Sequence, residues 1–105
     1  MNQIPYEERE KVYTRAVKAF GEEKQMVVAL EELSECQKEI CKFLRGFGNA
    51  GNLAEEIADA TIMLEQMRLI FGLNDMVCQI MDQKIMRLED KLKGKPRQNT
   101  TEHIF

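Results

Sequence analysis

Apolar residues return every three or four positions along most of this chain, and that period matches one turn of an α-helix. The pattern predicts four helices separated by short breaks. The first two cover about 6–20 and about 22–45. The third runs to about 71, and the fourth runs from a cap at Asn74 or Asp75 to about 92. We therefore expect an all-α protein.

The breaks between the predicted helices carry recognisable start and stop signals. Pro5 precedes the first helix, where proline is tolerated, and Gly21 ends it. A stretch rich in glycine and asparagine, 46–52, has the composition of a mobile turn. Asn52 is expected to be the N-cap of the third helix, with Glu55 completing a capping box.

The second predicted helix carries a narrow apolar stripe with alternating spacings of four and three. Its members are Met26, Leu30, Leu33, Gln37, Ile40 and Leu44. Such a stripe is typical of a buried seam, so we expect this face to pack in the core. The side away from the seam carries four glutamates, Glu31, Glu32, Glu35 and Glu39. By pattern alone, these glutamates form either a solvated face or part of a site.

The third predicted helix is apolar almost all round, which is typical of a central helix. At about 100° per residue, Glu56 falls inside its broad apolar arc and Asp59 falls at the edge. A buried carboxylate is costly unless it meets a cation or hydrogen-bond donors, so we interpret Glu56 as a sign of a site. The alternative is that acids at this end complement the helix dipole, which suits Glu55 better.

Two pairs of carboxylates share a spacing of three residues. Glu32 and Glu35 project from one face of the second helix, and Glu56 and Asp59 project from one face of the third. If the two helices pack as an antiparallel hairpin, the four side chains converge on one spot. Such an arrangement is costly without a cation, and hard divalent ions such as Mg²⁺ prefer oxygen ligands of this kind.

Composition narrows the class of protein. The 105 residues fit one helical domain over 1–93, followed by an extended tail over 94–105. A net charge of −3 argues against a nucleic-acid partner. No apolar run approaches the roughly 20 residues that span a bilayer, and the polar N-terminus is unlike a signal peptide, so we expect a cytoplasmic protein without membrane contact. The three cysteines are expected to be reduced thiols in or beside the core.

The fourth predicted helix has two basic residues in or beside its apolar stripe. Lys84 lies within the stripe and Arg87 lies at its margin. Their long stems either cover apolar surface while the charges reach water, or bring charge to anionic oxygens beside the metal site. The single histidine, His103, lies in the tail, which disfavours a histidine-based triad or a zinc site.

The order of these short motifs resembles one family of enzymes. Phe20-Gly21-Glu22-Glu23 leads to Glu31-Glu32-x-x-Glu35, which is followed by Glu56-x-x-Asp59 and then by Lys84-x-x-Arg87. Each motif is weak alone, but their order, spacing and helical setting together resemble the MazG-like nucleoside triphosphate pyrophosphohydrolases. This all-α superfamily also includes dimeric dUTPases, dCTP pyrophosphatases and phosphoribosyl-ATP pyrophosphatase.

The resemblance implies a four-helix MazG-like bundle that assembles as a homodimer or homotetramer. It implies four ligands for Mg²⁺, or for Mn²⁺ as the alternative ion, namely Glu32, Glu35, Glu56 and Asp59. It also implies that Lys84 and Arg87 contact phosphates. Either Glu35 or Glu32 is the candidate catalytic carboxylate that orients the attacking water.

Members of this family cleave a nucleoside triphosphate between the α and β phosphates, giving the monophosphate and pyrophosphate. We therefore expect a Mg²⁺-dependent pyrophosphohydrolase that clears unwanted nucleoside triphosphates. Base preference stays open, because the chain has no tryptophan and its aromatic residues also suit core packing. The phosphoribosyl-ATP branch is disfavoured because 60–63 lack the Tyr-His pair associated with it.

Two other functions fit the same residues. One is a non-catalytic helical oligomerisation module whose acids only keep it in solution or bind a partner. The other is a nucleotide-sensing domain that binds the same ligands without hydrolysing them. Release of pyrophosphate from a panel of triphosphates distinguishes the enzyme from both.

Overall fold

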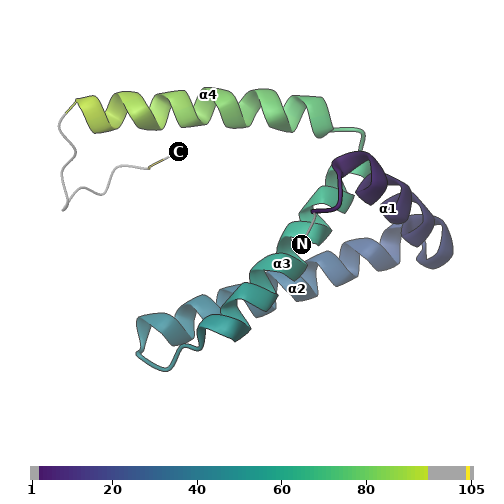
Figure 1. Ribbon diagram of the computed structural model, residues 1–105, viewed down its shortest axis with the longest axis horizontal. Helices are drawn as coiled ribbons and strands as arrows, with labels where there is room; N and C mark the ends of the chain where they lie inside the picture. Colours follow the sequence, from purple (N-terminus) through teal and green to yellow (C-terminus); the bar gives the residue numbers. More distant parts are fainter. Residues whose placement is uncertain (1–2, 95–103, 105) are drawn as a thin grey trace. The chain divides into compact units, whose positions relative to one another are not determined.

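The structure of the protein, a computed structural model, describes residues 3–94 and residue 104. These residues form four α-helices and no strand (Figure 1). The helices are α1 (Tyr6–Phe20), α2 (Glu22–Leu44), α3 (Ala50–Ile70) and α4 (Asn74–Lys93). The prediction of an all-α chain is confirmed. Apart from Gly94 and Ile104, the predicted tail over 94–105 lies outside the described residues.

The chain divides into two compact units, the first ending at Leu73 and the second beginning at Asn74. The first unit contains α1, α2 and α3, and the second contains α4. Within the described part of the chain, no helix is both long enough and apolar enough to cross a bilayer.

A single residue separates α1 from α2. The backbone of Gly21 has a φ of 91°, in the left-handed region that residues with a side chain rarely adopt. Its N–H donates a hydrogen bond to the Val17 carbonyl at 2.8 Å and closes the end of α1. Both predicted ends of α1 are confirmed.

The start of α3 differs from the prediction. The N-cap is Asn49, whose side-chain oxygen accepts a hydrogen bond from the Asn52 N–H at 3.0 Å. Asn52 therefore lies in the first turn as a donor, and the predicted capping box at Asn52 is wrong. A Cβ added to Gly48 would collide with the ring of Phe43, so the connecting loop lies close against the end of α2.

The helices α2 and α3 pack side by side as an antiparallel hairpin (Figure 1). Gln25 near the start of α2 donates a 2.6 Å hydrogen bond to Gln66 near the end of α3, and both side chains are buried. Helix α1 packs against both, and its Tyr13 hydroxyl and Arg9 guanidinium donate to opposite oxygens of Glu65. Each of the three helices of this unit therefore contacts the other two, and the central place of α3 stays a prediction.

The face of α2 that packs on α3 is not the predicted seam. The buried residues of α2 are Gln25, Ala29 and Glu39. By contrast, Leu30 is 69% exposed and Leu44 is 84% exposed. The prediction that the seam is buried within the chain is therefore wrong. Periodicity reveals an apolar stripe but not which helix covers it, and the small Ala29 gives α3 a place for close approach.

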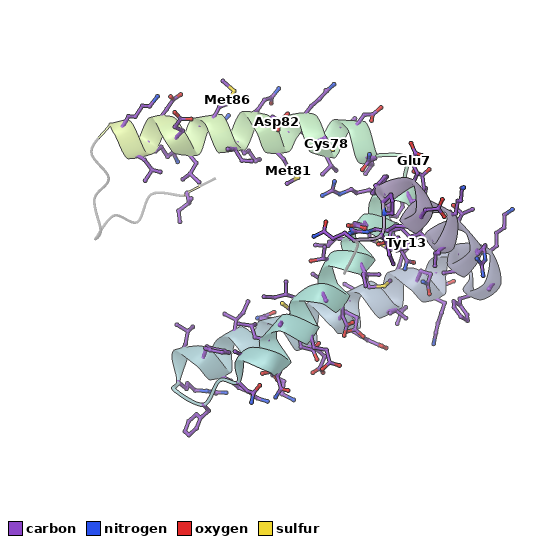
Figure 2. The ribbon with its side chains drawn as sticks, in the orientation of Figure 1. Glu7, Tyr13, Cys78, Met81, Asp82 and Met86 are labelled. Atoms are coloured by element: carbon purple, nitrogen blue, oxygen red, sulfur yellow. The ribbon has the colours of Figure 1, made fainter. Side chains whose placement is uncertain are left out.

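Helix α4 is amphipathic, and none of its described residues is buried. Figure 2 shows Met81 and Met86 projecting to different sides of the helix. Of the described cysteines, Cys36 is half-buried, whereas Cys41 and Cys78 are exposed. The expectation that all three lie in or beside the core is wrong for those two.

Candidate metal centre

Three of the four predicted metal ligands come together on the hairpin. Glu32 lies near the middle of α2, and Glu56 and Asp59 lie on successive turns of α3. One carboxylate oxygen from each residue lies within 4.8 Å of the others. The antiparallel packing produces this group, because residues in the middle of α2 face the first half of α3.

Glu56 has the most unusual environment of the three. Its side chain is half-buried, and its Oε2 atom is buried without a hydrogen-bond partner among the described atoms. A buried carboxylate oxygen without a donor is unfavourable, because the charge has lost water and gained nothing in return. The position of Glu56 inside the apolar arc of α3 predicted this tension from sequence.

The electrostatics of the group reflect crowding of like charges. Partial loss of hydration raises the pKa of Glu32, and the carboxylates of Asp59, Glu31 and Glu35 raise it further. Loss of hydration also raises the pKa of Glu56, followed by the charges of Glu32, Asp59 and Glu35. A positive charge placed among crowded carboxylates favours their ionised forms, because opposite charges attract.

Glu35, the fourth predicted ligand, lies at the edge of the group. Its side chain is exposed, and none of the three carboxylate oxygens that lie within 4.8 Å of one another belongs to Glu35. Its charge nevertheless contributes to the raised pKa of both Glu32 and Glu56. Glu35 therefore influences the group electrostatically while its side chain stays open to solvent.

Another acidic residue of α2, Glu39, was recognised in the sequence but not chosen as a metal ligand. Glu39 is 7% exposed; its Oε1 pairs with Lys42 Nζ at 3.1 Å, and its Oε2 is buried without a hydrogen-bond partner. The sequence does predict that Glu39 and Glu32 share a face of α2, because they are seven residues, or about two helical turns, apart. The sequence alone offered no reason to separate Glu39 from a solvated face.

The oxygen atoms of this group suit a small hard cation. Mg²⁺ takes oxygen ligands at about 2.1 Å in octahedral geometry, so its ligands lie about 3 Å apart when adjacent and about 4.2 Å apart when opposite. The 4.8 Å spread of the three carboxylate oxygens approaches these separations. If a divalent cation binds here, Glu32, Glu56 and Asp59 are the residues that would hold it.

The two predicted phosphate ligands lie on α4, in the second unit. Lys84 is half-buried and Arg87 is exposed. Their spacing of three residues places them on one face of the helix. Their contact with phosphates stays a prediction.

Compared with protein family models, with curated proteins and with solved structures, the chain gives no match.

Proposed function

We propose that this chain is a Mg²⁺-dependent nucleoside triphosphate pyrophosphohydrolase, built as a MazG-like bundle and acting as a homodimer or homotetramer. Its role would be to clear unwanted nucleoside triphosphates by converting them to monophosphate and pyrophosphate. The observation that supports this most is the carboxylate group of Glu32, Glu56 and Asp59, in which a buried oxygen of Glu56 has no protein partner.

The residues of the site divide into two roles. Glu32, Glu56 and Asp59 would hold a divalent cation, and the chemistry that it would supply is positive charge beside the phosphate oxygens. Glu35, exposed beside them, orients a water molecule and accepts its proton. The water oxygen bonds to the α-phosphorus while the bond from that phosphorus to the bridging oxygen breaks. Pyrophosphate leaves with the electron pair, and the proton passes from Glu35 to solvent.

The decisive experiment measures pyrophosphate release from a panel of nucleoside triphosphates, with Mg²⁺ and with a chelator. The proposal expects release only with the cation. Glu35→Gln should lower turnover by roughly 10²- to 10⁴-fold, the usual contribution of a general base, while keeping the cation-induced rise in Tm. Glu56→Gln should lose both turnover and the rise in Tm.

A matched control uses the neighbouring acid. Glu55→Gln removes a charge from the same turn of α3, but Glu55 is exposed and outside the carboxylate group, so turnover and the response to cation should stay close to wild type. Absence of pyrophosphate from every triphosphate, despite cation binding, would refute the hydrolase. Nucleotide binding without turnover would identify a sensing domain instead.

A further inference from the structure

Helix α2 presents one stripe of residues to α3, here called the inner stripe. Its members are buried or half-buried at alternating spacings of four and three, namely Gln25, Ala29, Glu32, Cys36 and Glu39. Gln25 donates to Gln66 on α3. Glu32 meets Asp59 of α3 in the carboxylate group. Glu39 continues the same stripe toward the loop, so its side chain faces α3 rather than solvent.

The register of the two helices places Glu39 beside the first turn of α3. Seven residues separate Gln25 from Glu32 on α2, and seven separate their partners on α3. One more step of seven on each helix sets Glu39 level with Asn52, in the first turn of α3. Seven residues rise by about 10 Å, so Glu39 lies about that far from Glu32 along the hairpin.

The carboxylate of Glu39 is only half engaged. Its Oε1 atom accepts a hydrogen bond from Lys42 Nζ at 3.1 Å, whereas its Oε2 atom is buried with no hydrogen-bond partner among the described residues. Only 7% of the residue is exposed. A buried acceptor without a donor is unfavourable, so a ligand that brings an N–H group to Oε2 would gain a strong hydrogen bond.

The loop end of the hairpin is the end that stays open. At the opposite end, α1 packs against α3, where two of its side chains donate to Glu65 (Figure 1). Residues 43–52, at the loop end, are all exposed. A nucleotide whose phosphates lie at the carboxylate group would therefore extend toward the loop. The step of about 10 Å from Glu32 to Glu39 matches the length of an extended nucleotide between its α-phosphate and the outer edge of its base.

An aromatic ring lies one helical turn beyond Glu39. The side chain of Phe43 is 43% exposed, and its ring lies against Gly48 of the loop. Residues four apart on a helix share a face, so Phe43 and Glu39 lie on the same side of α2. Any base can stack on an exposed aromatic ring. The loop end therefore offers a stacking surface and, beside it, one acceptor that the chain itself does not satisfy.

We propose that Glu39 selects the base of the substrate by accepting a hydrogen bond from an exocyclic amino group, so that triphosphates of amino-bearing bases are preferred to those of uracil or thymine. An amino group protrudes from the ring and reaches a buried oxygen while the ring stays outside. Uracil and thymine carry carbonyl oxygens at the protruding positions, and the Glu39 carboxylate would repel them. A buried acceptor discriminates against an analogue that leaves it unpaired. The inference rests on the proposed hydrolase and names the class of base that it takes.

The test compares bases in which a carbonyl oxygen replaces the amino group. Wild type should favour cytidine over uridine triphosphate, in ribo or deoxy form, by about 10- to 100-fold in kcat/KM, the scale of a hydrogen bond to a charged partner. Adenosine and inosine triphosphates form a second such pair. Glu39→Gln should remove most of the preference, because the amide turns either its oxygen or its NH₂ group toward the base. The change should appear in KM rather than in kcat, since Glu39 does not touch the reacting phosphate.

The matched control is Glu23→Gln, the same substitution at an exposed position in the first turn of α2, and it should keep the wild-type preference. Circular dichroism establishes that the helices of each variant form, and the comparison of substrates on wild type needs no variant. Equal kcat/KM within both pairs, or a preference that survives Glu39→Gln, overturns the role of Glu39 even if the hydrolase stands.

Binding of α,β-methylene triphosphate analogues separates this inference from the proposed function, because these analogues are not cleaved between the α and β phosphates. Tighter binding of the cytidine analogue, lost in Glu39→Gln, supports the role of Glu39 even if no triphosphate is hydrolysed. Equal binding of the cytidine and uridine analogues overturns that role. A chain that neither binds the analogues nor cleaves the triphosphates overturns both proposals.

Discussion

Replacing Tyr13 with phenylalanine removes one hydroxyl from the place where α1 meets α3. The Tyr13 side chain is buried (labelled in Figure 2), and its hydroxyl donates to Glu65 Oε2, while Arg9 pairs with Oε1 of the same carboxylate at 3.0 Å. A hydrogen bond to a charged partner contributes about 1.5–3 kcal/mol of stability. Tyr13→Phe should therefore destabilise the fold by about 2 kcal/mol, which for a unit of this size is a fall in Tm of about 10 °C.

The effect also has a pH dependence with a defined sign. Burial, followed by the hydrogen bond and the negative charge of Glu65, raises the pKa of Tyr13 from 10.0 to about 12. The folded chain therefore holds this proton more tightly than the unfolded chain does. The stabilisation is fully present below pH 10 and is lost as pH rises toward 12.

Urea unfolding of wild type and Tyr13→Phe at one fixed protein concentration, at pH 8 and in steps above pH 10, measures both effects. Lys11→Gln is the control on the same helix, since it breaks an exposed 3.4 Å ion pair with Glu8 and should change stability by less than about 0.5 kcal/mol. Equal stability of wild type and Tyr13→Phe at pH 8 would refute the reasoning. So would a difference that fails to shrink above pH 10.

Two further predictions concern the hairpin. Mg²⁺ or Mn²⁺ should raise the Tm at pH 7, and this rise should fade as pH falls toward the ordinary glutamate pKa of 4.5. The reason is that the pKa values of Glu32 and Glu56 are raised, so both carboxylates become protonated in this range and lose the negative charge that attracts the cation. Because the raised pKa values mean that the folded chain binds these protons more tightly than the unfolded chain, the cation-free protein should gain stability as pH falls toward 4.5. Thermal unfolding with and without cation across this pH range measures both effects, and a cation-induced rise in Tm that does not depend on pH would count against the site. Gln25→Leu should cost about 1–3 kcal/mol by leaving Gln66 buried without its donor, whereas Gln25→Leu combined with Gln66→Met should recover most of that loss in urea unfolding.

Much of the fold was predictable because local signals fix helices. For α1, the helical period of the apolar residues predicted the helix, Pro5 predicted its start and Gly21 predicted its end. The start of α3 was harder, because Asn49 and Asn52 are both good caps. In the structure Asn49 is the cap, and the ring of Phe43 lies close against Gly48 in the same loop. Such a contact between a helix end and its loop produces no repeating pattern of apolar residues, so the sequence does not reveal it.

The site was predictable as far as helical geometry reaches. Spacing of three residues places Glu56 and Asp59 on one face, and the hairpin then brings Glu32 to them. The sequence could not place Glu35 at the edge, because that depends on how far α2 is rotated against α3. The same rotation decides that Ala29 is buried and Leu30 is exposed, and it follows from packing rather than from any single residue.

The one-residue connection at Gly21 also has a mechanical consequence for the carboxylates. Helices α1 and α2 are joined at Gly21, and α1 is tied to α3 by the hydrogen bonds that Arg9 and Tyr13 donate to Glu65. Helix α1 is thereby fixed against both helices that carry the carboxylates. Weakening the contact at Tyr13 should loosen the packing of these helices, and the protein would then discriminate less sharply between Mg²⁺ and a larger ion such as Ca²⁺.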